Sequence, residues 1–146
     1  MIRRMERKDR EEYLKMTGEF YASDAVLHEI PLQYRSDAFE ELMRSEDYIT
    51  AYLLEQDGKT AGYALLSRQF SQEAGGMALW IDEIYIRPPF RGRGLGSEFF
   101  RFLEGNIHGK IKRLRLETEP GNKGAQALYR RLGFRPLGYL QMIKGD

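Results

Sequence analysis

The sequence predicts a single α/β (α+β) domain over residues 1–146, in which hairpins and helices surround one glycine-rich loop. A chain of 146 residues can bury one sizeable hydrophobic core but hardly two. Two turn signals, Asp57-Gly58 and Gly75-Gly76, separate strand-like segments in the middle of the chain. The glycine-rich loop comes after these apparent hairpins, which leaves little room for a doubly wound parallel sheet.

The first third of the chain is predicted to contain a short strand over residues 2–5 and two helices. Asp9 is a candidate N-cap with Glu12 three residues later, a variant of the capping box. Pro31 interrupts the chain before a second helix over residues 37–45. The apolar side chains that would form the buried face of the first helix recur at helical spacing: Tyr13, Met16, Phe20 and Tyr21.

The middle of the chain is predicted to form strands over residues 48–55, 60–70 and 77–86, separated by the two glycine turns. A helix is expected after Gly96, because the residues from there on place apolar side chains on one face. The side chains of that face are Leu95, Phe99, Phe102 and Leu103.

The last third is predicted to contain a strand, a helix and two short strands. Residues 113–119 alternate between polar and apolar side chains, as a half-buried strand does. A helix that begins at Asn122 should stop at Gly133, since glycine is the usual residue just beyond a helix end. Two short strands are expected to follow, over residues 134–137 and 139–143.

The most informative segment is the strand, loop and turn over residues 84–97. Pro88-Pro89 lacks amide donors and disfavours helix for the residue before it, so the strand should end near Arg87. Beyond it, alternate glycines let backbone amides converge without obstruction, and the following helix N-terminus adds partial positive charge. Such a loop is an anion site suited to a pyrophosphate, so the sequence predicts a phosphorylated cofactor.

Two common phosphate-binding motifs fit this chain poorly. A Walker loop requires Gly-x-x-x-x-Gly-Lys-Ser/Thr, and the Gly-Lys-Thr that starts at Gly58 has Leu53 where the first glycine belongs. A dinucleotide fingerprint read from Gly92 has Ser97 in place of its third glycine, although Glu117 lies near the expected acidic position.

A third motif, Arg/Gln-x-x-Gly-x-Gly/Ala, is matched in full by Arg91, Gly94 and Gly96. Here the chain resembles the GNAT superfamily of acetyl-CoA-dependent N-acetyltransferases. A second segment, residues 122–134, is similar to the late helix of that family, with its Asn, its Tyr and its closing Leu-Gly-Phe. Both segments follow the family's order and spacing, and the resemblance spans roughly residues 48–140.

The resemblance implies a mixed, largely antiparallel twisted sheet that is flanked by helices and splayed where acetyl-CoA enters. It implies that the pantetheine lies along the backbone of Ile84 and Ile86, and that Asn122 contacts the coenzyme arm. The residues expected to bind acetyl-CoA are therefore the strand end, the loop and this asparagine: Ile84, Tyr85, Ile86, Arg91, Gly92, Arg93, Gly94, Leu95, Gly96, Ser97 and Asn122.

Transfer of an acetyl group to an amine requires a neutral amine and a proton for the departing thiolate. A simple alkyl ammonium has a pKa near ~10.4, so the site must help it to lose a proton at pH 7. Glu83 is the first candidate for the base or for an anchor of the amine, and Asp82 is the second. Neighbouring side chains on a strand point to opposite faces, so both line one cavity only if the strand bulges. Alternatively, each carboxylate is a charge at a strand edge that opposes aggregation.

The resemblance places the phenol of Tyr129 near the coenzyme sulfur, where it can protonate the leaving thiolate. A phenol with a pKa near ~10 beside a thiol with a pKa near ~8.5 makes this transfer feasible. The alternative is an aromatic ring that packs in the core. Because the chain has no cysteine, an acetyl-cysteine intermediate is excluded, and direct transfer in a ternary complex is the simplest chemistry.

Composition limits the partners and the location. A net charge of +1 gives no general attraction to nucleic acid. No apolar run approaches the length of a membrane span, and the N-terminus does not resemble a signal peptide. The absence of cysteine suits a cytoplasmic protein. With two histidines in all, one of them His28, no metal site is expected.

The expected acceptor is a small-molecule primary amine, and the expected assembly is a monomer or a homodimer. A protein or peptide amine, N-terminal or lysine, is the second expectation, and a non-catalytic acyl-CoA sensor is the third. In the family, the first helices and the segment before the cofactor strand shape the acceptor pocket. The residues there that can receive a cation are Tyr21, Asp24, His28, Glu29, Tyr34 and Trp80.

Overall fold

The structure is a computed structural model that describes residues 1–106 and 110–145. Five strands form one sheet in the spatial order β1-β2-β3-β4-β5, antiparallel except for the parallel pair β4–β5. The strands are β1 (Ile2–Arg4), β2 (Ile49–Gln56), β3 (Lys59–Ser71), β4 (Gly76–Ile86) and β5 (Ile111–Leu116). The helices are α1 (Arg10–Tyr21), α2 (Leu32–Arg44), α3 (Leu95–Asn106) and α4 (Lys123–Arg131), with short 3-10 turns η1 (Arg7–Asp9) and η2 (Pro88–Phe90). The predicted fold class, a mixed and largely antiparallel sheet flanked by helices, is confirmed.

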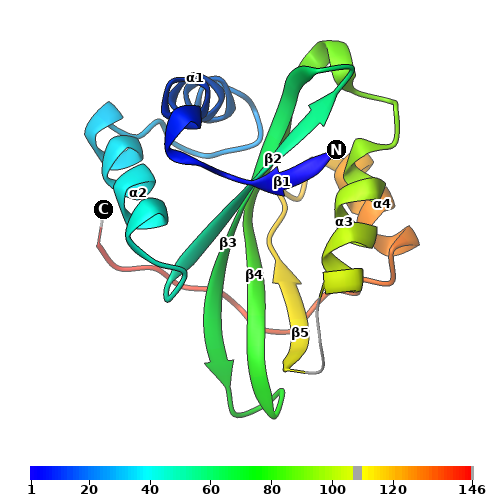
Figure 1. The fold of residues 1–146 in the computed structure, drawn as a ribbon. Coiled ribbons are helices and arrows are strands. Elements are labelled where there is room, and N and C mark those ends of the chain that lie inside the picture. The colour runs from blue at the N-terminus through cyan, green and yellow to red at the C-terminus, as the bar shows by residue number, and fades with distance from the viewer. Residues whose placement is uncertain (107–109, 146) are drawn as a thin grey trace.

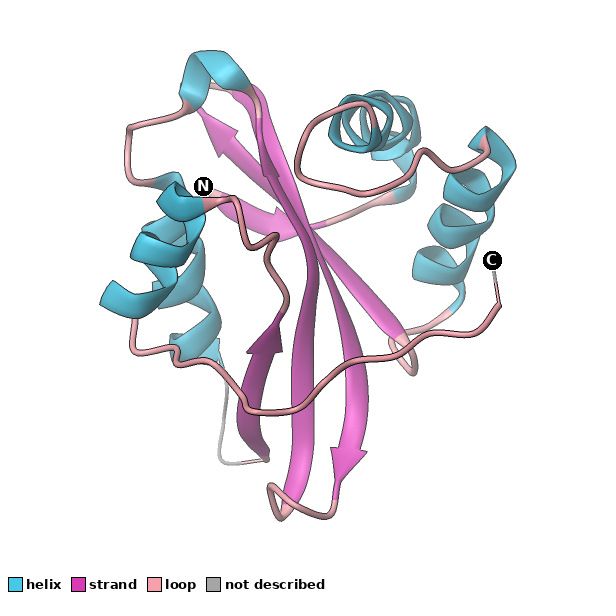
Figure 2. Ribbon diagram, turned by 180° about the vertical axis from the view of Figure 1, so that it is seen from behind, coloured by secondary structure: helices cyan, strands magenta, loops and turns pink. Residues whose placement is uncertain are grey.

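The two faces of the twisted sheet carry different helices (Figure 1). Helices α1 and α2 cover one face, and α3 and α4 cover the other, as the view from behind also shows (Figure 2). The first face buries Tyr13, Phe39 and Tyr63 in one hydrophobic cluster. The second face buries Phe99 and Phe100 in a separate cluster. The sheet therefore divides the core into two halves, and a group on one face is screened from groups on the other.

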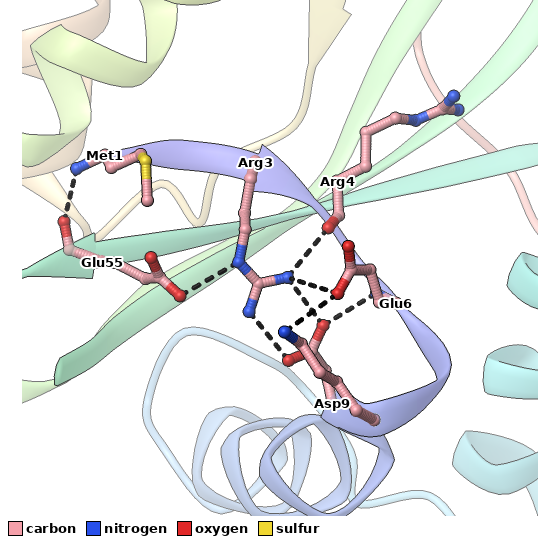
Figure 3. Close-up of polar contacts among 7 residues, drawn as sticks. Met1, Arg3, Arg4, Glu6, Asp9 and Glu55 are labelled. Carbon is pink, nitrogen blue, oxygen red and sulfur yellow. Dashed lines mark hydrogen bonds and ion pairs between the residues drawn. The ribbon is translucent and has the colours of Figure 1, made fainter. Parts of the chain in front are cut away.

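The predicted capping box between Asp9 and Glu12 is wrong. Asp9 is the N-cap residue of α1, but its carboxylate turns back toward the strand before it. Oδ2 accepts from the amide of Glu6 at 2.7 Å, and the two oxygens accept from the guanidinium of Arg3 at 2.9 Å each (Figure 3). Arg3 also donates to Glu55 of β2 at 3.0 Å. Asp9 bonds to the half-buried guanidinium of Arg3 rather than to the helix amides, because a charge-assisted bidentate bond is stronger than a bond to one amide.

Two predicted helix and strand limits also shift. Helix α2 begins at Leu32, directly after Pro31, rather than at residue 37. Proline is favoured at such a helix start, where its missing amide costs nothing. Strand β5 ends at Leu116, so residues 117–119 are outside the sheet.

The two strands predicted over residues 134–137 and 139–143 do not form. Residues 134–145, called the tail below, carry no regular structure in the described chain. Gly133, with a φ of 92°, ends α4 as expected. The tail then leads across β5, β4 and β3 and ends beside α2, rather than running alongside β5 (Figure 2).

Candidate active site

A β-bulge in β4 decides which way the two candidate carboxylates point. Leu65 of β3 pairs with Glu83 and Leu66 pairs with Ile81, so Asp82 is an extra residue without a partner in β3. A bulge of this kind resets the alternation of side chains along a strand. After it, Glu83 faces the α1/α2 side of the sheet. The condition for both carboxylates to approach one face is therefore met.

Glu83 is held by two phenols. Tyr21, the last residue of α1, donates to Oε2 at 2.6 Å, and Tyr63 of β3 donates to Oε1 at 2.7 Å. Burial raises the pKa of the Glu83 carboxyl above its usual range, the two hydrogen bonds oppose this rise, and the charge of Asp82 adds to it. Tyr63 is fully buried, whereas Tyr21 and Glu83 are half-buried.

Asp82 is more exposed than Glu83, and its carboxylate is not held between two phenols. Loss of water around its carboxyl group raises its pKa, a hydrogen bond from Ser67 opposes the rise, and the nearby charge of Glu117 adds to it. The two carboxylates therefore differ: Glu83 is held in place by two hydrogen bonds, and Asp82 is exposed at the surface.

The sheet splays next to Glu83. The parallel pairing of β4 with β5 ends where Ile81 meets Leu116, and β4 continues for five more residues along β3 alone. Arg87 donates its amide to the carbonyl of Ala61 in β3 at 2.8 Å, so the preceding residue, Ile86, directs its backbone groups to the other edge. Ile84 faces the same way, two residues earlier. The predicted backbone edge is therefore present between the parting strands.

The glycine-rich loop lies at the end of this edge. Gly92 and Gly94 have φ of 75° and 80°, a region that strongly favours glycine, and open space surrounds the place where a side chain would start. The carbonyl of Gly94 accepts from the amide of Glu98 at 2.9 Å, which begins the hydrogen bonding of α3. The amides of the first turn lack partners within the helix, so the loop fits a phosphate group.

The other loop residues divide into backbone and side-chain contributors. Leu95 buries its side chain in the α3/α4 cluster, and a Cβ on Gly96 would lie 3.3 Å from Leu128 of α4. These two residues therefore present only their amides at the helix start, while Gly96 also lets α4 approach α3. Ser97 is half-buried in the first turn of α3. Arg91 donates from Nε to the carbonyl of Ile86 at 2.8 Å and lies 5.8 Å from the ring centre of Tyr85.

Arg93 lies 5.8 Å from the ring centre of Phe90. Tyr85 packs its ring in the α1/α2 cluster, 6.1 Å from Phe20, and pairs with Tyr63 of β3, so its backbone groups do not point to the open edge. Asn122 caps α4, where its Oδ1 accepts from the amide of Ala125 at 3.2 Å. This cap orients the asparagine side chain at the helix start.

Tyr129 lies on the opposite face from Glu83. Its ring packs 5.9 Å from Phe100 and 5.9 Å from Phe134, and burial raises the pKa of its phenol. The structure therefore does not bring the two candidate catalytic side chains into contact. Glu83 packs beside the α1/α2 cluster and Tyr129 beside the α3/α4 cluster, so the sheet lies between them.

The expected acceptor residues separate in the same way. Tyr21 contacts Glu83, whereas Trp80 donates to Gln69 at 3.0 Å and lies under the guanidinium of Arg115. The remaining candidates, Asp24, His28, Glu29 and Tyr34, are exposed around the connection from α1 to α2. The sequence did not predict Tyr63 as a partner of Glu83. Its one signal is a phenol within the apolar run of β3, where a buried hydroxyl requires a partner.

A cavity of about 580 Å³ lies beside β5. It is lined by β5, α4 and the tail, and Tyr129 forms part of its wall. Within residues 1–106 and 110–145, no cluster of three or more metal-binding side chains is found. The helices in this described part are all too short or too polar to cross a membrane.

The acetyltransferase (GNAT) family profile matches residues 10–134 of this chain. A Bacillus subtilis (strain 168) protein described as a ribosomal protein bS18-alanine N-acetyltransferase is 30% identical over 113 residues, which are 72% of this chain and 66% of that protein. The thialysine N-epsilon-acetyltransferase of Bos taurus is 28% identical over 132 residues, 86% of this chain and 72% of that protein. The chain thus spans about two thirds of the first relative and somewhat more of the second.

The fold is also that of solved acetyltransferases. The structure of AAC(6')-Iy in complex with the bisubstrate analogue CoA-S-monomethyl-acetylneamine superimposes with a TM-score of 0.81 at 18% identity. The superposition covers 100% of this chain and 97% of that one. The described sheet, its splay and its flanking helices therefore form a known architecture.

Proposed function

This chain belongs to the acetyltransferase (GNAT) family of acetyl-CoA-dependent enzymes, and from that premise we propose that it acetylates a primary amine by direct attack in a ternary complex. One observation carries the proposal: the splayed edge of β4 joins a glycine loop with open space at Gly92 and Gly94 to the phenol-bound carboxylate of Glu83. A phosphate-binding end and a candidate proton acceptor thus lie along one strand.

The loop and the strand edge hold the coenzyme in this proposal. The amides from Gly92 to Ser97 and the N-terminus of α3 receive the pyrophosphate, where positive dipole ends favour an anion. The pantetheine arm runs along Ile84 and Ile86 as an added strand would. In the structure, Arg91 donates a hydrogen bond to the carbonyl of Ile86. Its side chain must therefore turn toward the phosphates before that carbonyl can accept a hydrogen bond from the pantetheine arm. Asn122, at the start of α4, contacts the arm.

Glu83 and Tyr129 move the protons. The amine nitrogen attacks the thioester carbonyl, a C–N bond forms and the C–S bond breaks. Glu83 takes the proton that the amine loses, and Tyr129 gives its phenolic proton to the departing thiolate. Solvent then returns one proton from the glutamic acid to the phenolate, which completes the balance. Asp82, at the rim beside Glu83, is the reserve base.

The proposed acceptor is a small-molecule amine, with a peptide N-terminus or a lysine as the second candidate. The related proteins differ on this point: one is named for a ribosomal protein alanine, another for thialysine, and AAC(6')-Iy is solved with an aminoglycoside analogue. Tyr21, which bonds to Glu83, is half-buried. This supports an acceptor that places one amine next to Glu83 while the rest of the acceptor molecule remains in solvent. We place the enzyme, as one domain, in the cytoplasm.

The decisive experiment measures release of free coenzyme A thiol from acetyl-CoA with a panel of small amines, peptides and lysine derivatives. We expect turnover with at least one class and its loss in Glu83→Gln. Calorimetry measures acetyl-CoA binding in parallel. Binding without turnover on any amine would leave the sensor role, and an absence of binding would refute the coenzyme site.

A further inference from the structure

Arg87, the residue directly after β4, bonds through its side chain to α1. Nε and Nη2 donate to the two carboxylate oxygens of Glu19 at 3.2 and 3.3 Å. Nη1 donates to Glu12 at 3.0 Å and to the carbonyl of Thr60 at 3.2 Å. The Arg87 side chain is 19% exposed, so water weakens this contact less than it weakens an ion pair at the open surface. The guanidinium therefore joins two carboxylates of one helix to the sheet.

The last turn of α1, residues 18–21, is weak by its composition. Gly18 favours helix less than any residue type except proline. Glu19 carries a negative charge close to the negative end of the helix dipole, and the sequence of this turn contains no lysine or arginine. Arg87 therefore supplies, from the end of β4, the cation that this helix end lacks.

This turn carries Tyr21. Tyr21 is the last residue of α1, two residues after Glu19, and donates to Oε2 of Glu83 at 2.6 Å. The second phenol, Tyr63, lies on β3, the strand paired with β4, so the sheet itself sets its distance to Glu83. The contact of Tyr21 instead joins a helix to the sheet. It therefore depends on how firmly the end of α1 is held against the sheet.

We infer that Arg87 is a positioning residue, which fixes the last turn of α1 to the end of β4 and thereby keeps the hydroxyl of Tyr21 on the carboxylate of Glu83. The backbone of Arg87 also leads toward the glycine loop, and its carbonyl accepts from the amide of Phe90 at 2.9 Å. One residue thus links the strand end before the loop with the helix that carries Tyr21. The importance of this link for turnover rests on the proposed role of Glu83.

The groups around Glu83 show why Tyr21 transmits the effect. The side chains there that carry or can carry a charge come from α1, β3, β4 and α2: Tyr13, Tyr21, Tyr63, Asp82, and Arg35, whose charge lowers the pKa of Tyr13. Only Tyr21 among them belongs to the turn that Arg87 holds.

The direction of the effect follows from the length of the hydrogen bond. A shift of the turn by about 1 Å lengthens the 2.6 Å bond between Tyr21 and Glu83 beyond hydrogen-bonding range, whereas a water molecule needs a gap of about 2.8 Å. Loss of the Arg87 contacts should therefore remove this hydrogen bond without hydrating Glu83. The pKa of Glu83 should then rise, because a bond that favours its charged form is gone.

The test measures the pKa of Glu83 by NMR titration of the full chain, isotope-labelled at the carboxyl carbons of its glutamates. The signal of Glu83 is identified by its loss in Glu83→Gln. Arg87→Gln and Glu19→Gln each break the bidentate ion pair but change the local charge in opposite directions. A direct effect of charge would raise the pKa in the first variant and lower it in the second. We expect a rise in both, by up to about one unit, as in Tyr21→Phe.

Two further chains isolate the path of the effect. Combined with Tyr21→Phe, Arg87→Gln should cause no further rise, because the bond that it protects is already absent. The matched control is Arg3→Gln. Arg3 makes a similar set of bonds at the start of α1, to both oxygens of Asp9 at 2.9 Å and to Glu55 at 3.0 Å (Figure 3). Arg3→Gln should lower the melting temperature and leave the pKa of Glu83 unchanged.

The inference is overturned by a wild-type pKa of Glu83 in Arg87→Gln, by shifts of opposite sign in Arg87→Gln and Glu19→Gln, or by an equal rise in Arg3→Gln. A full further rise in the Tyr21→Phe background would also overturn it. Because the side chain of Glu19 is 39% exposed, Glu19→Gln decides the question even if Arg87→Gln does not fold. The titration uses no substrate, so its outcome is distinct from a failure of the proposed function, which the thiol-release assay measures.

Discussion

The two sides of the splayed sheet prepare their candidate groups by different means. On the α1/α2 side, Glu83 is positioned by side chains, through phenol hydrogen bonds of 2.6 and 2.7 Å. At the glycine loop, the groups are backbone amides, positioned by the φ values of Gly92 and Gly94 and by the start of α3. A side-chain site fails when one functional group is removed, whereas a backbone site fails only when the chain path changes. The role of Glu83 is therefore tested by removing a functional group, and the role of the glycine loop by a substitution that changes or obstructs its backbone.

The largest effect is expected from Tyr129→Phe. Loss of a positioned general acid lowers turnover by ~10²–10⁴-fold, while acetyl-CoA affinity stays near that of the wild type, because the hydroxyl matters only as charge develops on sulfur. The matched control is Tyr52→Phe, whose ring packs in the same cluster, 5.3 Å from Phe102. Single-turnover measurements check both variants. If Tyr129→Phe stays within about threefold of the wild type, the residue serves packing alone.

Glu83→Gln should lower turnover nearly as much at neutral pH, by ~10²-fold or more. Because burial raises the pKa of Glu83, the wild-type rate should fall as the pH drops through that raised pKa, from a point above the usual range of a glutamate. The variant should lack this acidic limb and regain part of its rate at high pH, where free amine is abundant.

Asp82→Asn is the matched control for the base, since it removes the neighbouring carboxylate at the bulge. A pH-rate profile for each variant across the acid and alkaline range decides between them. A wild-type profile for Glu83→Gln together with a collapsed rate for Asp82→Asn would transfer the role to Asp82.

Gly94→Val tests the backbone half. The φ of 80° is costly for a β-branched residue, and the new side chain would fill the space proposed for the pyrophosphate. Calorimetry should show acetyl-CoA binding weakened by ~10-fold or more, as for an obstructed phosphate site. Gly58→Val carries the same backbone strain at a φ of 72° in the β2–β3 turn, also with open space around it. Equal affinities for the two variants would refute the loop assignment.

A smaller effect is expected from removing the phenols around Glu83. The hydrogen bonds from Tyr21 and Tyr63 lower the pKa of Glu83, so Tyr21→Phe or Tyr63→Phe should move the acidic limb of the rate profile to higher pH. Tyr63 is fully buried, so its loss should also lower the melting temperature more than loss of the half-buried Tyr21. An unmoved acidic limb in both variants would mean that Glu83 does not set it.

The smallest effect on catalysis is expected from Asp9→Asn, which lies outside both halves of the site. Hydrogen bonding to Arg3 holds the pKa of Asp9 below its usual range, and its side chain is buried. The substitution should lower the free energy of unfolding by about 2 kcal/mol at pH 7 with turnover unchanged. Urea unfolding measures this cost.

The sign of its pH dependence follows from the lowered pKa. The stability that Asp9 contributes is present above the unfolded-state pKa and is lost as the pH falls through the folded-state value. The difference between wild type and Asp9→Asn should therefore shrink below about pH 4. A difference that stays constant into strong acid would show that the ion pair is not its source.

Local sequence signals predicted most of the elements but not their partners. The turn at Asp57-Gly58 and the prolines after Arg87 mark the strand ends correctly, because turn and proline chemistry acts within a few residues. The limits of α2 and the capping by Asp9 were predicted wrongly. In the latter case, a cation on β1 competes for the carboxylate, and only the folded chain brings the two together.

The sequence by itself determined the order of the elements, the glycine loop, the family and the candidate residues, since each depends on short-range spacing. Only the tertiary structure decided how these residues are used. The bulge at Asp82 turned Glu83 toward Tyr21 and Tyr63, and the sheet placed Tyr129 on the other face. The tertiary structure likewise left the tail unpaired although its composition favours a strand, because a strand exists only where a partner offers its backbone hydrogen bonds.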